Sequence, residues 1–252
     1  MPDSPTNNWS TLNLLKVNDR TQTFAEGNLD YSSTQTSTNP AVTSTFAVSS
    51  GKWYWETYIR AQGNAVNSVG IASNPNDLEN DSTALYSKST AYSYQANGNK
   101  RNNSDASYGD TWTTGDIIGV ALDLDAGALY FYKNGSNSGT AAYTSLSGEF
   151  TSYGLIYNSG ARVYNFGQDD TFNNNKTSGS ANASDSSGLG QFYYSVPSGY
   201  NSLCASNLPS ITLGPGKTEQ PNDFFDTILY TGNGNELAVG TGGMRRPLDT
   251  IS

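Results

Sequence analysis

Carboxylates are the side chains of this 252-residue sequence best suited to chemistry, because the sequence contains no histidine. The lack of histidine removes the commonest general base, and with it Ser-His-Asp triads and HExxH zinc sites. Glu56 and Glu149 have the side chains needed for the carboxyl pair of a glycosidase. No spacing brings two carboxylates into one cleft, so the sequence identifies no catalytic residue. We expect no enzyme, and a polysaccharide-degrading enzyme is the least favoured alternative.

Three aspartates near the middle of the chain are candidate cation ligands. Asp116, Asp123 and Asp125 lie close together in sequence, but their spacing lacks the ligand repeat of a calcium loop. Aspartates in turns and at strand ends usually accept hydrogen bonds from nearby backbone N–H groups. We therefore expect turn chemistry from these residues, with no metal and no cofactor. The single cysteine, Cys204, is expected to be a small buried residue.

Binding is a stronger prospect than catalysis, because tyrosines flank several polar loops. The loops lie around residues 74–82, 97–108 and 136–139, and their binding candidates are Asn74, Asp77, Tyr86, Tyr94, Lys100, Arg101, Tyr108 and Asn137. Exposed tyrosines are expected in any case among the 17 of this sequence, and short charge clusters commonly lie on solvated surface. A pair of tryptophans in one alternating strand, Trp53 and Trp55, is expected to be core and not a platform for sugars.

The charge and hydropathy of the sequence exclude two classes of partner. Thirteen Lys and Arg against 22 Asp and Glu give a net charge of −9, which repels phosphate backbones and anionic lipids. No apolar run approaches the roughly 20 residues needed to span a bilayer. Residues 1–13 lack the basic start and apolar stretch of a signal peptide. We expect neither nucleic-acid binding nor membrane insertion.

A hairpin over residues 115–135 is expected at the centre of the fold. Residues 117–124 are β-branched and apolar, and residues 128–132 are aromatic, as in strands that are largely buried. Asp125-Ala126-Gly127 links them, and Asn134-Gly135 supplies a second turn. Shorter strand patterns occur on both sides of this hairpin: residues 29–32, 40–48, 52–59, 68–72, 86–94, 150–157 and 161–166. Strands at this spacing, without a long helix, predict an all-β antiparallel sandwich.

Composition divides the chain into four parts. Residues 1–28 form a lead-in or docking segment, residues 29–170 the sandwich, residues 171–190 an Asn/Ser/Gly-rich linker, and residues 191–252 a C-terminal arm. In the arm we expect a short helix capped by Ser198 and one or two strands, including residues 224–230. The candidates for docking on other subunits are apolar residues of the two flanks: Trp9, Leu12, Leu14, Phe192, Tyr193, Phe224 and Phe225.

Five stretches between residues 40 and 168 follow one another in a specific order. They are Gly51-Lys52-Trp53-Tyr54-Trp55-Glu56, Val69-Gly70-Ile71-Ala72, Tyr108-Gly109, residues 115–135 and Val163-Tyr164-Asn165-Phe166-Gly167-Gln168. In order and spacing they resemble a SPRY domain, a bent β-sandwich of the concanavalin A-like jelly-roll type. The resemblance implies a binding module that recognises partners through loops at one end and carries no catalytic residues. Eukaryotic relatives join ubiquitin-ligase assemblies, but this sequence has no cysteine-rich zinc module and no coiled-coil heptads.

Further stretches flank this region: Trp9 to Leu15, Gly27-Asn28-Leu29, Gly190-Gln191-Phe192-Tyr193-Tyr194 and Pro197 to Pro209. They resemble SPRY-bearing structural proteins encoded by tailed phages, particularly from marine samples. The resemblance implies a virion protein on the particle surface, as a tail-fibre or spike component or a capsid-decorating protein. Its partners would be other virion proteins or copies of itself. A lectin-like adhesin that binds a host-surface glycan through the three loops is the alternative.

Overall fold

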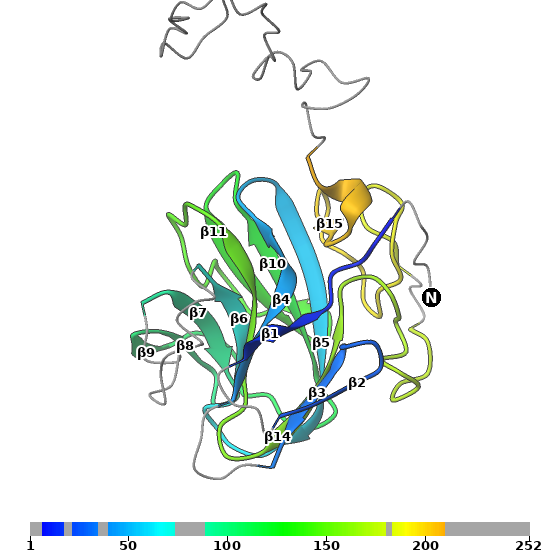
Figure 1. Ribbon diagram of the computed structural model, residues 1–252. Helices are drawn as coiled ribbons and strands as arrows, with labels where there is room; N and C mark the ends of the chain where they lie inside the picture. The colour runs from blue at the N-terminus through cyan, green and yellow to red at the C-terminus, as the bar shows by residue number, and fades with distance from the viewer. Residues whose placement is uncertain (1–6, 18–21, 35–39, 74–88, 180–182, 210–252) are drawn as a thin grey trace, which may run out of the picture. The chain divides into compact units, whose positions relative to one another are not determined.

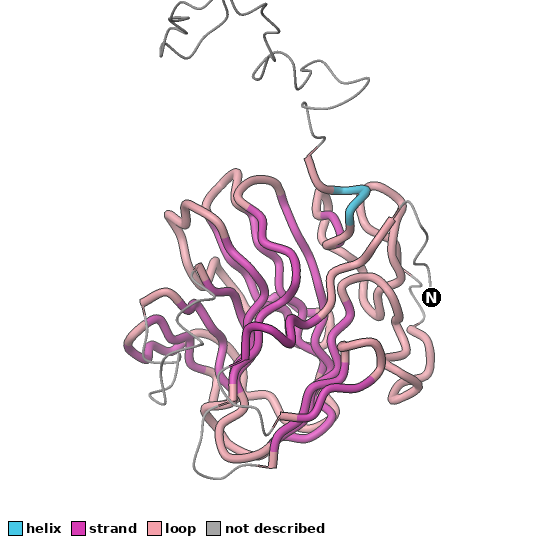
Figure 2. Tube along the Cα trace, in the orientation of Figure 1, coloured by secondary structure: helices cyan, strands magenta, loops and turns pink. Residues whose placement is uncertain are grey.

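The computed structural model describes residues 7–17, 22–34, 40–73, 89–179 and 183–209 of the chain. Their strands form two facing antiparallel sheets, so the fold is the all-β sandwich that the sequence predicts (Figure 1). Strands and loops make up almost all of the described residues, and the helical turn η3 (Ala205–Asn207) is drawn in cyan (Figure 2). No helix within the described ranges is long and apolar enough to cross a membrane.

The first sheet has seven strands in the spatial order β1-β4-β13-β6-β7-β8-β9. In that order the strands are β1 (Leu12–Val17), β4 (Ala41–Val48), β13 (Phe150–Leu155), β6 (Ser68–Ala72), β7 (Ala91–Gln95), β8 (Asn99–Asn102) and β9 (Ser104–Ser107). Strands far apart in sequence are neighbours here, since β13 lies between β4 and β6. Strand β9 forms one edge of this sheet.

The second sheet follows the order β12-β11-β10-β5-β14-β3-β2. These strands are β12 (Ser136–Asn137), β11 (Ala128–Lys133), β10 (Ile117–Asp123), β5 (Lys52–Gln62), β14 (Gly160–Asn165), β3 (Asp30–Ser33) and β2 (Thr23–Ala25). A short strand near the C-terminal end of the described chain, β15 (Asn201–Ser202), pairs in parallel with β5. Strand β12 forms an edge of the second sheet.

The predicted central hairpin is confirmed as β10 and β11. The two strands pair in register from Ile118 opposite Lys133 to Asp123 opposite Ala128. Gly127 in the linking turn has a φ of 64°. In the turn after β11, Asn134 and Gly135 have φ values of 50° and 80°, the left-handed conformation that Asn-Gly turns favour.

The core between the sheets contains the tryptophans of β5, as the alternation predicts. Trp53 and Trp55 are 3% and 1% exposed and pack with Ile118, Val120 and Leu122 of β10. Side chains alternate across a strand, so the intervening residues of β5 and β10 face away from this core. All seven residues of β10 are nevertheless buried. The outer face of the second sheet must therefore be covered as well.

A C-terminal strap, defined here as residues 170–179 and 183–204, covers this outer face. Phe192 and Tyr200 pack on Tyr54 and Ala121, and the ring centroids of Tyr54 and Phe192 are 5.3 Å apart. In a second cluster Phe172 packs on Ile117 and Val163. The strap is largely irregular, but its aromatic side chains are packed against the sheet.

The two ends of the described chain meet on the sandwich. Trp9 forms a β-bridge with Cys204, and the backbone N–H of Ser10 donates to the carbonyl of Leu203 at 2.9 Å. Trp9 is 5% exposed and Cys204 is fully buried, as predicted for the cysteine. The segments before and after the sandwich thus complete one packed unit.

Three sequence-based expectations of secondary structure differ from the structure. Residues 97–107, expected as a loop, form the hairpin β8–β9, in which Asn103 takes a φ of 64° at the turn. The helix expected after Ser198 is absent from the described arm, where β15 and η3 occur instead because the backbone of Asn201 and Ser202 pairs with β5. Residues 12–17, expected to belong to a lead-in or docking segment, form the strand β1, which pairs with β4. The strand expected over residues 224–230 lies outside the described residues.

Candidate interaction surface

Loops and hairpins gather at one corner of the sandwich, called here the polar corner (residues 97–112 and 134–146). The Lys100 ammonium donates to the carbonyl of Ala142 at 2.6 Å. The Tyr143 hydroxyl donates to the carbonyl of Ser93 in β7 at 2.9 Å. These bonds join the β7–β9 region of the first sheet to the loop that follows β12 of the second. Two of the three predicted binding loops therefore lie together.

A cluster of aromatic rings packs between the polar corner and the core of the sandwich. The ring centroids of Tyr94 and Tyr108 lie 5.3 Å apart, and each ring also contacts Phe131 of β11. Tyr94 is fully buried, and its hydroxyl donates to the carbonyl of Asp110. Burial raises the pKa of Tyr94 to about 12. Tyr94, predicted as a binding residue, is thus a core residue because its ring fills the space beneath the corner.

Tyr108 and the two basic residues of the corner are engaged within the protein. The Tyr108 hydroxyl accepts the backbone N–H of Phe131 at 3.2 Å. The Lys100 ammonium also lies 5.4 Å from the centroid of the Tyr143 ring. Arg101 forms an ion pair with Asp105 across the β8–β9 hairpin, at 2.7 Å. A ligand that used these groups would have to displace such contacts.

The freely exposed part of the corner consists of short side chains on two strand edges. All four residues of β9 are exposed, and so are both residues of β12, including the predicted Asn137. Gly109, two residues after β9, lies close to Ser138, one residue after β12, since a Cβ placed on Gly109 would lie 3.0 Å from that of Ser138. The other predicted loop residues, Asn74, Asp77 and Tyr86, lie outside the described residues.

Edge strands expose backbone N–H and C=O groups that can pair with another chain. Strand β9 ends the first sheet and β12 ends the second, and neither pairs with a further described strand on its outer side. The side chains on these strands are short (Ser, Asp and Ala on β9, Ser and Asn on β12) and leave room for an approaching backbone. The corner can therefore recognise an extended segment or loop of a protein by backbone hydrogen bonds.

Most of the predicted docking residues are occupied within the chain. Trp9, Leu12 and Phe192 are at most 5% exposed, and Tyr193 is half-buried in the strap. These side chains pack on apolar residues of the chain's own sheets, such as Tyr54 and Ala121 beneath Phe192, and so are not available to another subunit. Leu14 in β1 is 43% exposed, and its neighbour Leu15 is 86% exposed. Phe224 and Phe225 lie outside the described residues.

The candidate catalytic and metal-binding carboxylates have structural partners. Asp116 accepts the N–H of Thr113, Asp125 that of Gly51, and Asp123 pairs with Lys52 at 2.9 Å. The bond from Thr113 to Asp116, and a further bond from the N–H of Ala126 to Asp123 at 2.9 Å, are the turn chemistry expected, whereas Asp125 joins two turns that are distant in sequence. Within the described ranges no three His, Cys, Asp or Glu side chains form a group able to hold a metal.

Glu56 has a role that the sequence analysis missed. It is fully buried under the strap, and its oxygens accept the backbone N–H groups of Tyr193 at 2.8 Å and Tyr194 at 2.9 Å. Burial raises the pKa of Glu56 to about 7, although these hydrogen bonds oppose the shift. The sequence did contain a signal for this role, because Glu56 is a charged residue between Tyr54 and Tyr58 on the outer face of β5. Glu149, its suggested partner in a glycosidase, is exposed.

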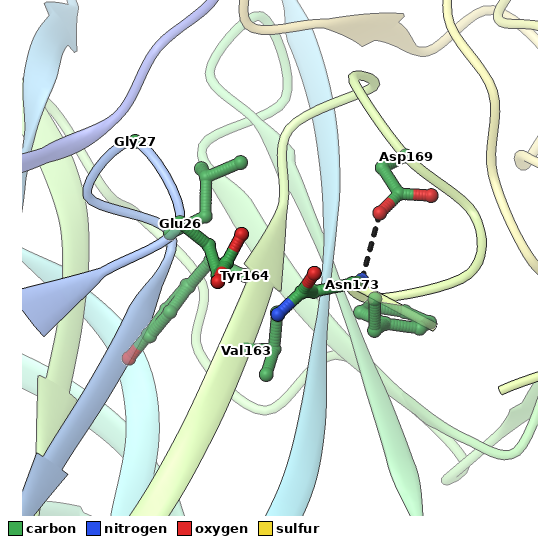
Figure 3. A pocket seen from close by; sticks show the side chains of 8 residues that line it. Glu26, Gly27, Val163, Tyr164, Asp169 and Asn173 are labelled. Carbon is green, nitrogen blue, oxygen red and sulfur yellow. Dashed lines mark hydrogen bonds between the residues drawn. The ribbon is translucent and has the colours of Figure 1, made fainter. Parts of the chain in front are cut away.

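A cavity of about 240 Å³ lies beside the start of the strap (Figure 3). It is lined by the turn at Glu26 and Gly27, by Val163 of β14, and by Asp169 and Asn173. Asp169 already accepts the backbone N–H of Asn173 at 2.7 Å. The cavity lies between the turn at Glu26 and Gly27 and the start of the strap. Asp169 forms part of its wall, and its carboxylate is already bonded to the backbone of Asn173.

The two facing sheets define the fold class, and comparison with known proteins assigns a family to part of the sandwich. Residues 52–169 match the model of the SPRY domain, so the chain carries a SPRY domain over this range. SPRY domains are protein-interaction modules. This confirms the resemblance to the SPRY family, whereas the phage resemblance of the flanks stays a prediction.

A solved structure and a curated protein are similar to the chain. The crystal structure of the SPRY domain of human HERC1 aligns with a TM-score of 0.52 and 22% identity, over 61% of this chain and 96% of that one. This likeness concerns the fold. The E3 ubiquitin-protein ligase RKP of Arabidopsis thaliana is 30% identical over 97 residues, which are 38% of this chain and 7% of that protein.

Proposed function

We propose that this chain is a non-enzymatic attachment protein on the surface of a phage particle. Its SPRY domain binds another virion protein, or a second copy of the chain, at the polar corner. The observation that carries the binding proposal is that β9 and β12 are exposed edge strands of the two sheets, and that Gly109, just after β9, lies beside Ser138, just after β12. The particle assignment rests on the flanking stretches that resemble phage structural proteins.

The mode of binding follows from the exposed groups. Backbone groups on β9 and β12 can pair with an extended segment of a partner, which gives affinity without large side chains. The polar corner also offers Ser, Asn and Thr side chains as hydrogen-bond donors and acceptors. Arg101 and Asp105, which pair with each other, add one charge of each sign beside this edge.

Two other functions have less support. A glycan-binding adhesin would need an exposed aromatic platform at the corner, but Tyr94 is buried and Tyr108 is half-buried with its hydroxyl engaged. The Arabidopsis relative is named an E3 ubiquitin-protein ligase, and its match to this chain covers 7% of its length. We therefore assign no ligase activity to this chain.

The test compares two exposed alanines on the same sheet. Ala106 lies on β9 at the polar corner, and Ala47 lies on β4. Particles are assembled with wild-type, Ala106→Arg or Ala47→Arg chains, and each chain is quantified in purified particles by mass spectrometry. We expect Ala106→Arg to lower incorporation at least tenfold and Ala47→Arg to leave it unchanged.

Each negative result removes a different part of the proposal. Absence of the wild-type chain from particles would exclude the virion assignment. Equal incorporation of both variants would exclude the polar corner as the attachment site. A glycan array with specific hits that Ala106→Arg abolishes would favour the adhesin instead.

A further inference from the structure

Arg162 occupies an unusual position inside the sandwich. It lies on β14 opposite Tyr31 of β3 and Ile59 of β5. Residues that are opposite each other on paired strands point to the same face of a sheet. Tyr31 and Ile59 belong to the core between the two sheets, so the Arg162 side chain enters that core too. It is fully buried.

The guanidinium of Arg162 has an aromatic neighbour but no hydrogen-bond acceptor. Its central carbon lies 5.1 Å from the centroid of the Trp112 ring. Among the described residues, no group accepts a hydrogen bond from its Nε, Nη1 or Nη2 atoms. The indole N–H of Trp112 and the hydroxyl of Tyr164, two residues further along β14, are also buried without a partner. This part of the core thus holds a surplus of donors.

The charge of Arg162 needs compensation. Burial lowers the pKa of Arg162 only to about 10, so the side chain is cationic at neutral pH. An isolated charge in an apolar interior is costly, and a cation–π contact at one face of the guanidinium offsets only part of that cost. The buried carboxylates of the described chain are engaged with other groups: Glu56 with Tyr193, Asp123 with Lys52, Asp170 with Ser178 and Asp185 with Ser202.

We infer that Arg162 binds a small monovalent inorganic anion of about the size of chloride between the two sheets. Such an anion accepts several N–H hydrogen bonds and neutralises the guanidinium at the same time. A water molecule could accept a hydrogen bond there but would leave the charge unpaired. The anion would act as a structural ligand that couples β14 to the core of the sandwich, and the site is independent of the polar corner.

Linkage between folding and anion binding provides the first test. Unfolding of the full chain by urea is measured over a range of chloride concentrations, with sodium gluconate added to keep the ionic strength constant. Once chloride exceeds its dissociation constant, each tenfold increase should raise the folding equilibrium constant about tenfold. Arg162→Met should abolish this dependence. Arg60→Met, which removes an arginine paired with Asp30 on the protein surface, should retain it.

Diffraction provides a second test that needs no variant. Crystals of the wild-type chain grown in sodium bromide should show an anomalous peak within hydrogen-bond distance of the Arg162 guanidinium. A site filled by water alone, or a wild-type stability independent of chloride, would overturn the inference. So would the same chloride dependence in wild type and Arg162→Met. If Arg162→Met does not fold, Arg162→Lys should keep a weakened dependence, and the bromide experiment still decides.

Discussion

The Oε2 atom of Glu56 accepts a hydrogen bond from the backbone N–H of Tyr193 at 2.8 Å, although the two residues are 137 positions apart in sequence. The other carboxylate oxygen accepts the N–H of Tyr194 at 2.9 Å. Glu56 thereby fixes the strap to the outer face of β5. One buried side chain thus joins the SPRY sandwich to the segment that follows it.

Stability should depend on pH through Glu56. Burial raises the pKa of this carboxyl from 4.5 to about 7, so between these values the folded state binds more protons than the unfolded state. The contribution of Glu56 is therefore fully present below pH 4.5 and is lost as the pH rises through 7, by about 3 kcal/mol. Glu56→Gln should remove this component of the pH dependence. Urea unfolding of wild type and Glu56→Gln between pH 4 and 8 measures it, and parallel curves would contradict the role.

Removal of the Glu56 side chain should loosen the strap. Glu56→Ala leaves the N–H groups of Tyr193 and Tyr194 buried without an acceptor, at a cost of about 1–3 kcal/mol each. Hydrogen exchange at these two amides should become faster, while amides of β10 should remain protected. Uniform acceleration across the sandwich would mean that Glu56 supports the whole fold and not the strap.

Trp9 should stabilise the chain's own fold. Its ring packs against Gly167 and Gly190, and it is 5% exposed. Trp9→Ala should destabilise the protein by about 3–5 kcal/mol, as expected for loss of a buried aromatic side chain. Leu15→Ala is the control, because Leu15 is 86% exposed and should change stability by less than about 0.5 kcal/mol. Equal losses in thermal or urea unfolding would contradict the packing of Trp9.

The ion pair between Arg101 and Asp105 should contribute little to stability. The two side chains are 18% and 39% exposed and lie on a hairpin at the edge of the sheet. Exposed pairs of this kind typically contribute about 0.2–1 kcal/mol. A double-mutant cycle with Arg101→Ala and Asp105→Ala measures the coupling. A coupling above about 2 kcal/mol would show that the pair holds the β8–β9 hairpin in place.

The sequence alone predicted the sandwich because its evidence is local. Alternation in residues 52–59 and the turn residues after β10 and β11 set which side chains face inward, and Trp53, Trp55 and the central hairpin lie as predicted. The β8–β9 hairpin escaped prediction because both strands are polar, with β8 half-buried and β9 exposed at the sheet edge, so they carry no hydrophobic alternation.

Only the tertiary structure decided what the aromatic flanks and the isolated charges do. Trp9 and Phe192 have the side chains of a docking surface, but both cover the chain's own sheets. Glu56 meets Tyr193, and Arg162 meets Trp112, through pairings across the whole chain. Such contacts depend on which strands become neighbours and which face is covered. Local residue patterns determine the strands and their inward faces, whereas burial of a particular charge is determined by packing between distant segments.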